Sequence, residues 1–138
     1  MVTGDVQWLA VIVAAIIGMA LGAFWYSKNG FGKAWMKEMG LSEEKLKTSQ
    51  QKMGKMYALT FVASLVSAFV LANVVRLAGA TTVGAGIAVG FWVWLGFAVP
   101  IMLGSILWEN KSQKLFNINA GYQLVSWLIM AAVLAIWA

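Results

Sequence analysis

Residues 83–108 read VGAGIAVGFWVWLGFAVPIMLGSILW, an apolar stretch that carries no charged side chain. A helix needs about 20 apolar residues to cross the roughly 30 Å hydrocarbon core of a bilayer. Three further stretches of similar length lie at about Val6–Tyr26, Met56–Leu77 and Ile118–Ala138. The sequence therefore predicts an all-α fold, a bundle of four transmembrane helices that forms one integral membrane domain over residues 1–138.

The composition agrees with a membrane protein and excludes several kinds of site. Apolar residues make up 62% of the chain and charged residues 11%, whereas soluble domains hold about 25% charged residues. The absence of histidine and cysteine excludes Cys/His zinc sites, haem ligation by these residues and thiolate catalysis. Since no Ser/His/Asp set, paired-carboxylate spacing or phosphate-binding glycine motif occurs either, we expect no enzyme activity, no metal and no cofactor.

The basic residues are distributed unevenly between the two sides of the predicted spans. Nine lysines fall in segments 27–55 and 109–117, whereas Arg76 is the only basic residue on the other side. The positive-inside rule then predicts that both segments are cytoplasmic and that both termini lie outside the plasma membrane. The lysines are interspersed with glutamates and no arginine accompanies them. The expected partner is therefore the lipid bilayer and not a nucleic acid.

The long loop between the first two spans is predicted to be partly helical. Apolar residues recur in it at helical spacing while its charged residues face elsewhere, which is typical of a short amphipathic helix at the membrane surface. Gly40 suits the C-terminal cap of this helix, and Ser42 suits the N-terminal cap of a second helix that leads into the second span. The apolar residues are Phe31, Trp35, Met36 and Met39, and the charged ones are Lys33, Lys37 and Glu38.

Two spans carry a stripe of polar residues at the helical spacing i, i+4, i+7, which places each stripe on one helix face. Polar groups at membrane depth are costly and often functional. Two interpretations remain open: a polar path for an ion or small solute, or hydrogen bonds that hold the helices together. The stripe of the last span is Asn119, Gln123 and Ser126, and that of the second span is Thr60, Ser64 and Ser67.

The third span holds the only proline of the chain, Pro100. Proline removes one backbone hydrogen bond and clashes with the carbonyl four residues earlier, so we expect a kink near Gly96. Glycines spaced i, i+4 also predict close helix packing, either within the chain or between chains. These pairs are Gly18 with Gly22 and Gly86 with Gly90.

Several short motifs resemble a known family. In order along the chain they are Trp25-Tyr26-Ser27, Phe31-Gly32-Lys33-Ala34-Trp35, Gly96-Phe97, Glu109, Leu115-Phe116 and Ile118-Asn119-Ala120-Gly121-Tyr122. The chain is similar to the small bacterial and fungal membrane proteins grouped as domain of unknown function 1761. The resemblance implies four spans and no particular activity. It also implies that Trp25, Tyr26, Lys33, Glu109, Asn119 and Tyr122 lie together at the cytoplasmic membrane face.

These observations favour a small transporter or channel-like protein for an ion or small solute. A 15.0 kDa bundle has little interior for a solute path, so such a protein would work as a homo-oligomer. The alternative is a non-catalytic scaffold or accessory subunit that packs against another membrane protein. Both hypotheses use the same residues: the kinked third span, the two polar stripes and the glycine faces.

Overall fold

The computed structural model describes residues 7–27, 29–40 and 53–137. All regular structure in these ranges is helical, which confirms the predicted fold class, and four helices are long and apolar enough to cross a membrane. The short helix expected in the first loop is also present, whereas the second one, from Ser42, lies outside the described residues. The elements are α1 (Trp8–Trp25), α2 (Gly32–Met39), α4 (Met53–Leu77), α5 (Val83–Val93), η2 (Trp94–Ala98), α6 (Val99–Leu107) and α7 (Gln113–Trp137).

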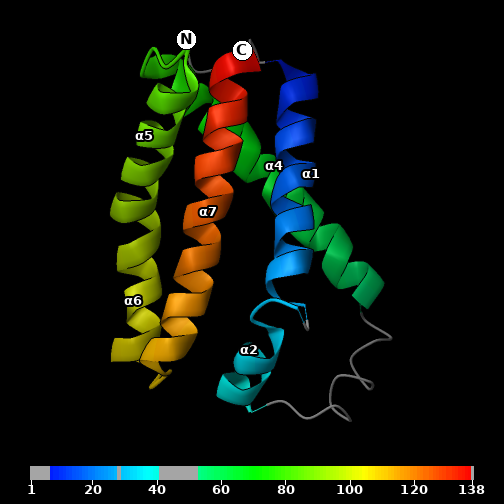
Figure 1. Cartoon of the computed structure of the whole chain (residues 1–138), viewed down its shortest axis with the longest axis vertical. Helices are drawn as coiled ribbons and strands as arrows, with labels where there is room; N and C mark the ends of the chain where they lie inside the picture. The colour runs from blue at the N-terminus through cyan, green and yellow to red at the C-terminus, as the bar shows by residue number, and fades with distance from the viewer. Residues whose placement is uncertain (1–6, 28, 41–52, 138) are drawn as a thin grey trace.

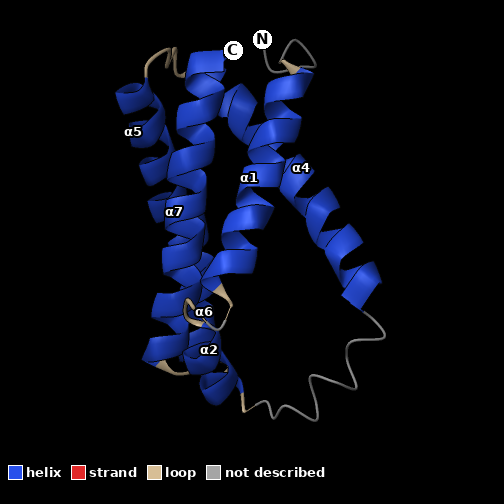
Figure 2. Cartoon of the chain, turned by 45° about the vertical axis from the view of Figure 1, so that its right-hand side comes forward, coloured by secondary structure: helices blue, strands red, loops and turns tan. Residues whose placement is uncertain are grey.

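The last span, α7, is the centre of the arrangement (Figure 1). It packs against α1 on one side and against the third span, α5–η2–α6, on the other. The fourth long helix, α4, packs on α1 and α7 near its end, and its start diverges from the rest of the bundle (Figure 2). The start of α1 and the end of α7 lie at the same end of the molecule. At the opposite end lie α2, the start of α4 and the start of α7 with the loop before it. These segments carry the exposed lysines Lys33, Lys37, Lys55, Lys111 and Lys114, and we call this end the basic end.

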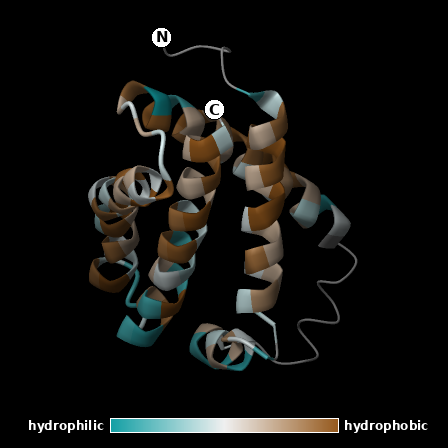
Figure 3. Cartoon of the chain, turned by 45° about the horizontal axis from the view of Figure 1, so that its top comes forward, coloured by the Kyte–Doolittle hydropathy of each residue, from teal (hydrophilic) through white to brown (hydrophobic). Residues whose placement is uncertain are grey.

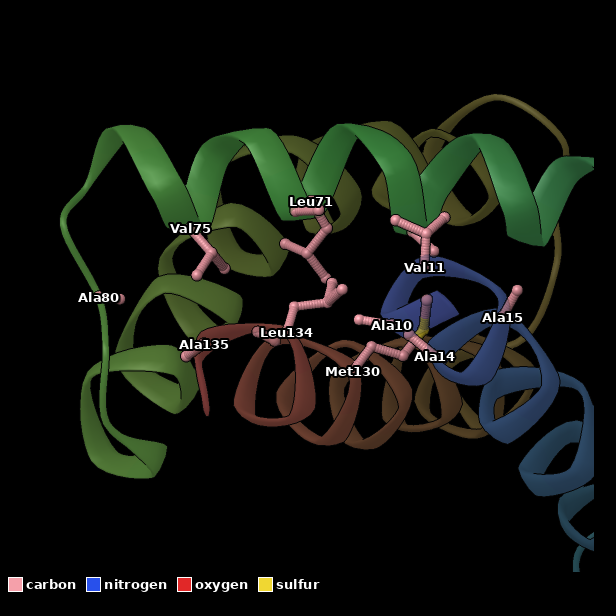
Figure 4. Close-up of a cluster of buried hydrophobic side chains, with 13 residues drawn as sticks. Ala10, Val11, Ala14, Ala15, Leu71, Val75, Ala80, Met130, Leu134 and Ala135 are labelled. Carbon is pink, nitrogen blue, oxygen red and sulfur yellow. The ribbon is translucent and has the colours of Figure 1, made fainter. Parts of the chain in front are cut away.

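Small residues allow the helices to approach closely in the core (Figure 4). Ala14 and Ala15 of α1, Ala68 of α4 and Ala131 of α7 are completely buried. Larger side chains, such as Leu71 of α4 and Met130 and Leu134 of α7, fill the space between them. Because lipid is as apolar as these side chains, the close packing itself holds the helices together.

Local hydrogen bonds fix where the helices begin and end. Gly40 closes α2 with a left-handed φ of 69°, as its predicted cap position requires. The side chain of Thr82 accepts a hydrogen bond of 3.1 Å from Ala85 N at the start of α5. Similarly, Ser112 Oγ accepts one of 3.0 Å from Leu115 N. This cap explains why α7 begins at Gln113, five residues before the apolar stretch predicted from Ile118.

The third span is continuous but contains a π-helical stretch, η2, at Trp94–Ala98. The stretch ends directly before Val99 and Pro100, and Val99 N bonds to the Trp94 carbonyl five residues earlier. The wider turn separates the proline ring from the carbonyl with which it would clash in a regular α-helix. Thus the structure places an irregularity at the position where the sequence predicts a kink.

Candidate functional site

At the basic end, two side chains that follow each other at the end of α1 bind α7. Trp25 Nε1 donates a hydrogen bond of 3.0 Å to the Ile118 carbonyl. Tyr26 Oη donates one of 2.7 Å to Asn119 Oδ1. Burial, together with the neighbouring Tyr122, raises the pKa of Tyr26, which directly follows α1, to about 12. The Tyr26 hydroxyl therefore keeps its proton at neutral pH and remains the donor of this hydrogen bond.

One turn further along α7, a tyrosine reaches across to the backbone of α1. Tyr122 Oη donates a hydrogen bond of 2.8 Å to the Gly18 carbonyl. A Cβ atom on Gly22 would lie 3.0 Å from the same hydroxyl oxygen. Gly22 therefore leaves the space that the tyrosine ring needs in order to reach Gly18.

Aromatic rings fill the space around these hydrogen bonds and hold α2 against the bundle. The ring centroids of Tyr26 and Tyr122 are 5.5 Å apart, those of Tyr26 and Trp35 5.8 Å, and those of Trp25 and Phe31 4.8 Å. Such tilted and edge-to-face pairs are favourable arrangements of aromatic rings. We call these five residues the tyrosine cluster. Because Trp35 and Phe31 belong to α2 and its first cap, the cluster connects α1, α2 and α7.

Of the residues that the resemblance groups at one face, the structure brings four together and leaves two apart. Trp25, Tyr26, Asn119 and Tyr122 are joined as described above. Lys33 on α2 and Glu109 after α6 are exposed at the same end of the molecule and take no part in the cluster.

Gly18 marks a second meeting point, where α1, α4 and α7 come close together. A Cβ atom on Gly18 would lie 3.3 Å from both Ser64 Oγ and Ser126 Oγ. Ser64 Oγ donates a hydrogen bond of 3.0 Å to the Ala15 carbonyl, and the buried Ser126 Oγ lies 3.4 Å from Met130 Sδ. The two serines, one from each polar stripe, thus meet beside Gly18, and both have partners within the chain.

The remaining stripe residues are not brought together. Thr60 is exposed, and its hydroxyl bonds to the Met56 carbonyl of its own helix at 2.8 Å. Ser67 is half-buried on α4. Gln123 is half-buried on α7, and its amide has no hydrogen-bond partner in the part of the chain that the structure describes.

A groove separates α4 from the third span, with α7 at its floor. It encloses about 310 Å³, and its lining is aliphatic or phenyl apart from the hydroxyl of Ser67 and the indole of Trp127. A second cavity, of about 460 Å³ between α5 and α7, is lined by aliphatic side chains only. We call the first one the lateral groove. Its lining residues are Val66, Ser67, Val70, Leu71, Val74, Val93, Phe97 and Trp127.

The glycine pairs of the first and third spans both pack within the chain. A Cβ atom on Gly86 would lie 2.6 Å from the Ala131 carbonyl oxygen, and one on Gly90 would lie 2.7 Å from that of Trp127. By contrast, a Cβ atom on Gly96 would meet no atom within 4 Å. Gly86 and Gly90 therefore permit the close contact of α5 with α7, while Gly96 leaves open space beside η2.

Sequence reasoning missed one residue that fixes the third span to α7. Trp94 Nε1 donates a hydrogen bond of 2.9 Å to the Ala120 carbonyl. Trp94 lies in the middle of its span, away from the interfaces where tryptophan is enriched in membrane proteins. This mid-span position was the sign in the sequence that the indole N–H of Trp94 needs a hydrogen-bond partner inside the bundle.

The side chains at these sites offer hydrogen bonds and apolar contacts. Among the described residues no three His, Cys, Asp or Glu side chains lie close enough together to hold a metal ion. Tyrosine, tryptophan, serine and amide groups occupy the meeting points of the helices, and most of them are bonded to other residues of the chain.

The sequence profile of the family described as "Protein of unknown function (DUF1761)" matches residues 9–135. The chain belongs to this family. The match runs from α1 to α7, so the resemblance seen in the sequence motifs is confirmed. In this DUF1761 protein, four of the residues behind that resemblance are the ones that join α1 and α7 at the basic end. Comparisons with curated proteins and with solved structures found no match.

Proposed function

We propose that this protein is a non-catalytic membrane scaffold that assembles with copies of itself through the lateral groove. The observation that carries the proposal is the groove itself, which lies between the later part of α4, from Val66 to Val74, and the third span. In a bilayer, a groove between transmembrane helices is filled either by lipid or by another helix.

The shape and polarity of the groove favour a helix over a lipid chain. Val66, Val70 and Val74 repeat at helical spacing on α4, which forms a row of roughly 12 Å along which another helix can pack. Ser67 adds a hydroxyl that a lipid chain cannot use. In addition, Pro100 lacks an N–H group and leaves a backbone carbonyl one turn earlier without its helical partner. Polar groups of this kind strengthen helix–helix contacts in membranes.

Self-complementarity favours a second copy as the source of that helix. The α4 valines that border the groove are also exposed, Val66 to 57% and Val70 to 52%, so α4 of each copy can pack in the groove of the other. Such an isologous contact is the commonest form of homo-oligomer. Gln123 lies one turn before Trp127 on the same face of α7. Its amide, which has no partner among the described residues, both donates and accepts hydrogen bonds, so two copies of it can pair.

The polar stripes support a packing role more than a pore. Ser64, Asn119 and Thr60 have hydrogen-bond partners within the chain, and Ser126 is buried beside Met130. Hydrogen bonds between segments, such as those of Ser64 and Asn119, stabilise helix contacts by about 0.6 kcal/mol each on average. Hydroxyls and amides that are already bonded are not available to replace the hydration of a passing ion.

Transport of an ion or small solute by the homo-oligomer is the second candidate function. The observation in its favour is Gln123, a half-buried amide without a partner among the described residues. Flux of ions and small solutes into proteoliposomes, compared between wild type and Gln123→Leu, tests it. A flux that Gln123→Leu abolishes would replace the scaffold proposal by transport, and absence of flux for all tested solutes would support the scaffold.

Self-assembly can be measured in liposomes at low protein density. The chain contains no cysteine, so Lys111→Cys provides one labelling site for fluorescence energy transfer between copies. We expect transfer for the labelled protein and a loss of at least severalfold in Phe97→Ala and Gln123→Leu. Ile101→Ala is the matched control, because Ile101 is 78% exposed on the third span and does not line the groove.

Three results would overturn the proposal. One is an absence of energy transfer at every protein density. Another is an equal loss of transfer in Ile101→Ala, which would show contact through a different face. The third comes from a photo-reactive residue at position 97: adducts only with lipid, or only with another membrane protein, would show that the groove does not accept a second copy.

The orientation in the membrane is part of the same proposal. We propose that the protein lies in the plasma membrane with the basic end in the cytoplasm, because lysines near span ends are retained on that side. The described lysines Lys33, Lys37, Lys55, Lys111 and Lys114 all lie at this end.

A further inference from the structure

The structure places four exposed lysines on or directly beside two elements that the tyrosine cluster holds together. Lys33 and Lys37 lie on α2, Lys114 lies in the first turn of α7, and Lys111 lies in the loop directly before α7. Helix α2 packs against α7, and the edge contact of Trp35 with Tyr26 holds it there. In Figure 3 the hydrophilic colour gathers on α2 and on the first turn of α7 at the basic end. We call these four residues the lysine group.

Apolar side chains are exposed next to the lysine group. Phe31 is 46% exposed and Met39 is 38% exposed, at the two ends of α2. An exposed lysine beside exposed apolar side chains suits the headgroup region of a bilayer, where the ammonium groups meet lipid phosphates and the apolar groups enter the acyl boundary. The acidic side chains described near the group, Glu38 and Glu109, are fewer than its lysines.

We infer that the lysine group is a binding site for the headgroup of an anionic phospholipid. Anionic lipid attracts basic groups near the membrane surface, at about fivefold in affinity per lysine. The ligand is a lipid and not a free phosphate, because Phe31 and Met39 give the site an apolar border against the membrane. The inference is independent of self-assembly through the lateral groove, which lies between α4 and the third span.

The site depends on the position of α2 as well as on charge. Without the contact between Trp35 and Tyr26, α2 would no longer hold Lys33 and Lys37 beside α7. A Trp35→Ala variant keeps every lysine and removes this contact. It therefore separates a site built by the fold from a general attraction of the positively charged chain to anionic lipid.

The test is native mass spectrometry of the protein released from nanodiscs made of equal amounts of POPG and POPC. We expect more bound POPG than POPC on the wild type. The preference should fall about 5- to 25-fold in K33Q/K37Q and in K111Q/K114Q, and it should also fall in Trp35→Ala. Lys55→Gln is the matched control, because Lys55 is exposed at the basic end but lies on the divergent start of α4.

Several outcomes would overturn the inference. Equal retention of the two lipids by the wild type would show that no anionic-lipid site exists. A loss in Lys55→Gln as large per lysine removed as in the double variants, that is about fivefold, or an unchanged preference in Trp35→Ala, would show that only net charge matters. Displacement of POPG by millimolar inorganic phosphate would identify a free-anion site instead. Circular dichroism of each variant shows whether its helices are intact. Raised salt should weaken the preference of the wild type for POPG, and this measurement needs no variant.

Discussion

Tyr122 on α7 donates a 2.8 Å hydrogen bond to the backbone carbonyl of Gly18 on α1, 104 residues earlier in the chain. A carbonyl inside an α-helix already accepts a hydrogen bond from its own helix, so this contact adds a donor to its second lone pair. The contact connects the tyrosine cluster with the point where α1, α4 and α7 meet. It is therefore a sensitive place at which to test the packing of the bundle.

Tyr122→Phe removes this hydroxyl and keeps the ring. We expect the free energy of unfolding to fall by about 0.5–1.5 kcal/mol, because one hydrogen bond is lost without a cavity in its place. Denaturant titration in detergent micelles measures the change. Tyr57→Phe is the control, since Tyr57 is 57% exposed and should tolerate the same substitution. Equal effects of the two changes would contradict the assigned role of Tyr122.

The hydrogen bond from Tyr26 to Asn119 can be measured by a double-mutant cycle. Tyr26→Phe and Asn119→Ala, alone and combined, should give a coupling energy of about 0.6 kcal/mol, with about 1.7 kcal/mol as the upper end seen in membrane proteins. Because burial raises the pKa of Tyr26 to about 12, the coupling should remain constant from pH 6 to 9. A coupling of zero would show that the contact does not contribute to stability.

The glycines of the third span provide a matched pair of substitutions. Gly86→Ala places a methyl group 2.6 Å from the Ala131 carbonyl oxygen, so α5 and α7 must move apart. We expect a loss of about 1–3 kcal/mol in the free energy of unfolding, as for other overpacked sites. Gly84→Ala meets no atom within 4 Å and should leave stability unchanged or slightly higher. Thermal unfolding in detergent would reveal an error in the packing of α5 if the two variants behaved alike.

Pro100 can be tested as the cause of the π-helical stretch. Pro100→Ala restores an N–H group and removes the ring, which should allow Trp94–Ala98 to return to a regular α-helix. Alanine is favoured over proline by about 3 kcal/mol inside a helix, so amide hydrogen exchange in this segment should slow down. Unchanged exchange would indicate that packing, including the Trp94 bond to the Ala120 carbonyl, holds the stretch in place.

The orientation of the protein can be tested with single cysteines, because none of its residues is a cysteine. Thr81→Cys, in the turn between α4 and α5, should react with a membrane-impermeant maleimide in intact cells. Lys111→Cys, at the basic end, should react only after the cells are permeabilised, as the distribution of lysines requires. The reverse pattern would place the basic end outside.

The spans themselves could be predicted from the sequence because length and apolar character are enough to define them. The short helix α2 was predictable too, since its apolar residues repeat at helical spacing and Gly40 closes it. The contacts that α2 makes could not be predicted. Trp35 was expected to face the membrane, whereas its ring packs on Tyr26. An aromatic residue in an amphipathic helix at the membrane surface produces the same apolar repeat whether its ring packs on lipid or on protein.

The rotation of the spans about their axes could not be predicted. These helices are apolar on every side, so no polar face distinguishes lipid from a neighbouring helix. For this reason the sequence indicated two polar stripes, but it did not show that Ser64 and Ser126 meet beside Gly18. Nor did it show that Gln123 has no partner in residues 7–27, 29–40 and 53–137. The divergence of α4 was equally hidden, because the apolar stretch from Met56 to Leu77 continues through both its diverging and its packed part.

The central place of α7 has a consequence for how the molecule is made. It is synthesised after the other three long helices, yet it contacts each of them and packs most extensively against α5 and α1. While the earlier three are already in the bilayer, α5 still lacks the partner to which Gly86 and Gly90 fit. Final assembly must therefore wait until α7 has been synthesised, and a chain that stops before Gln113 would leave α5 without its principal contact.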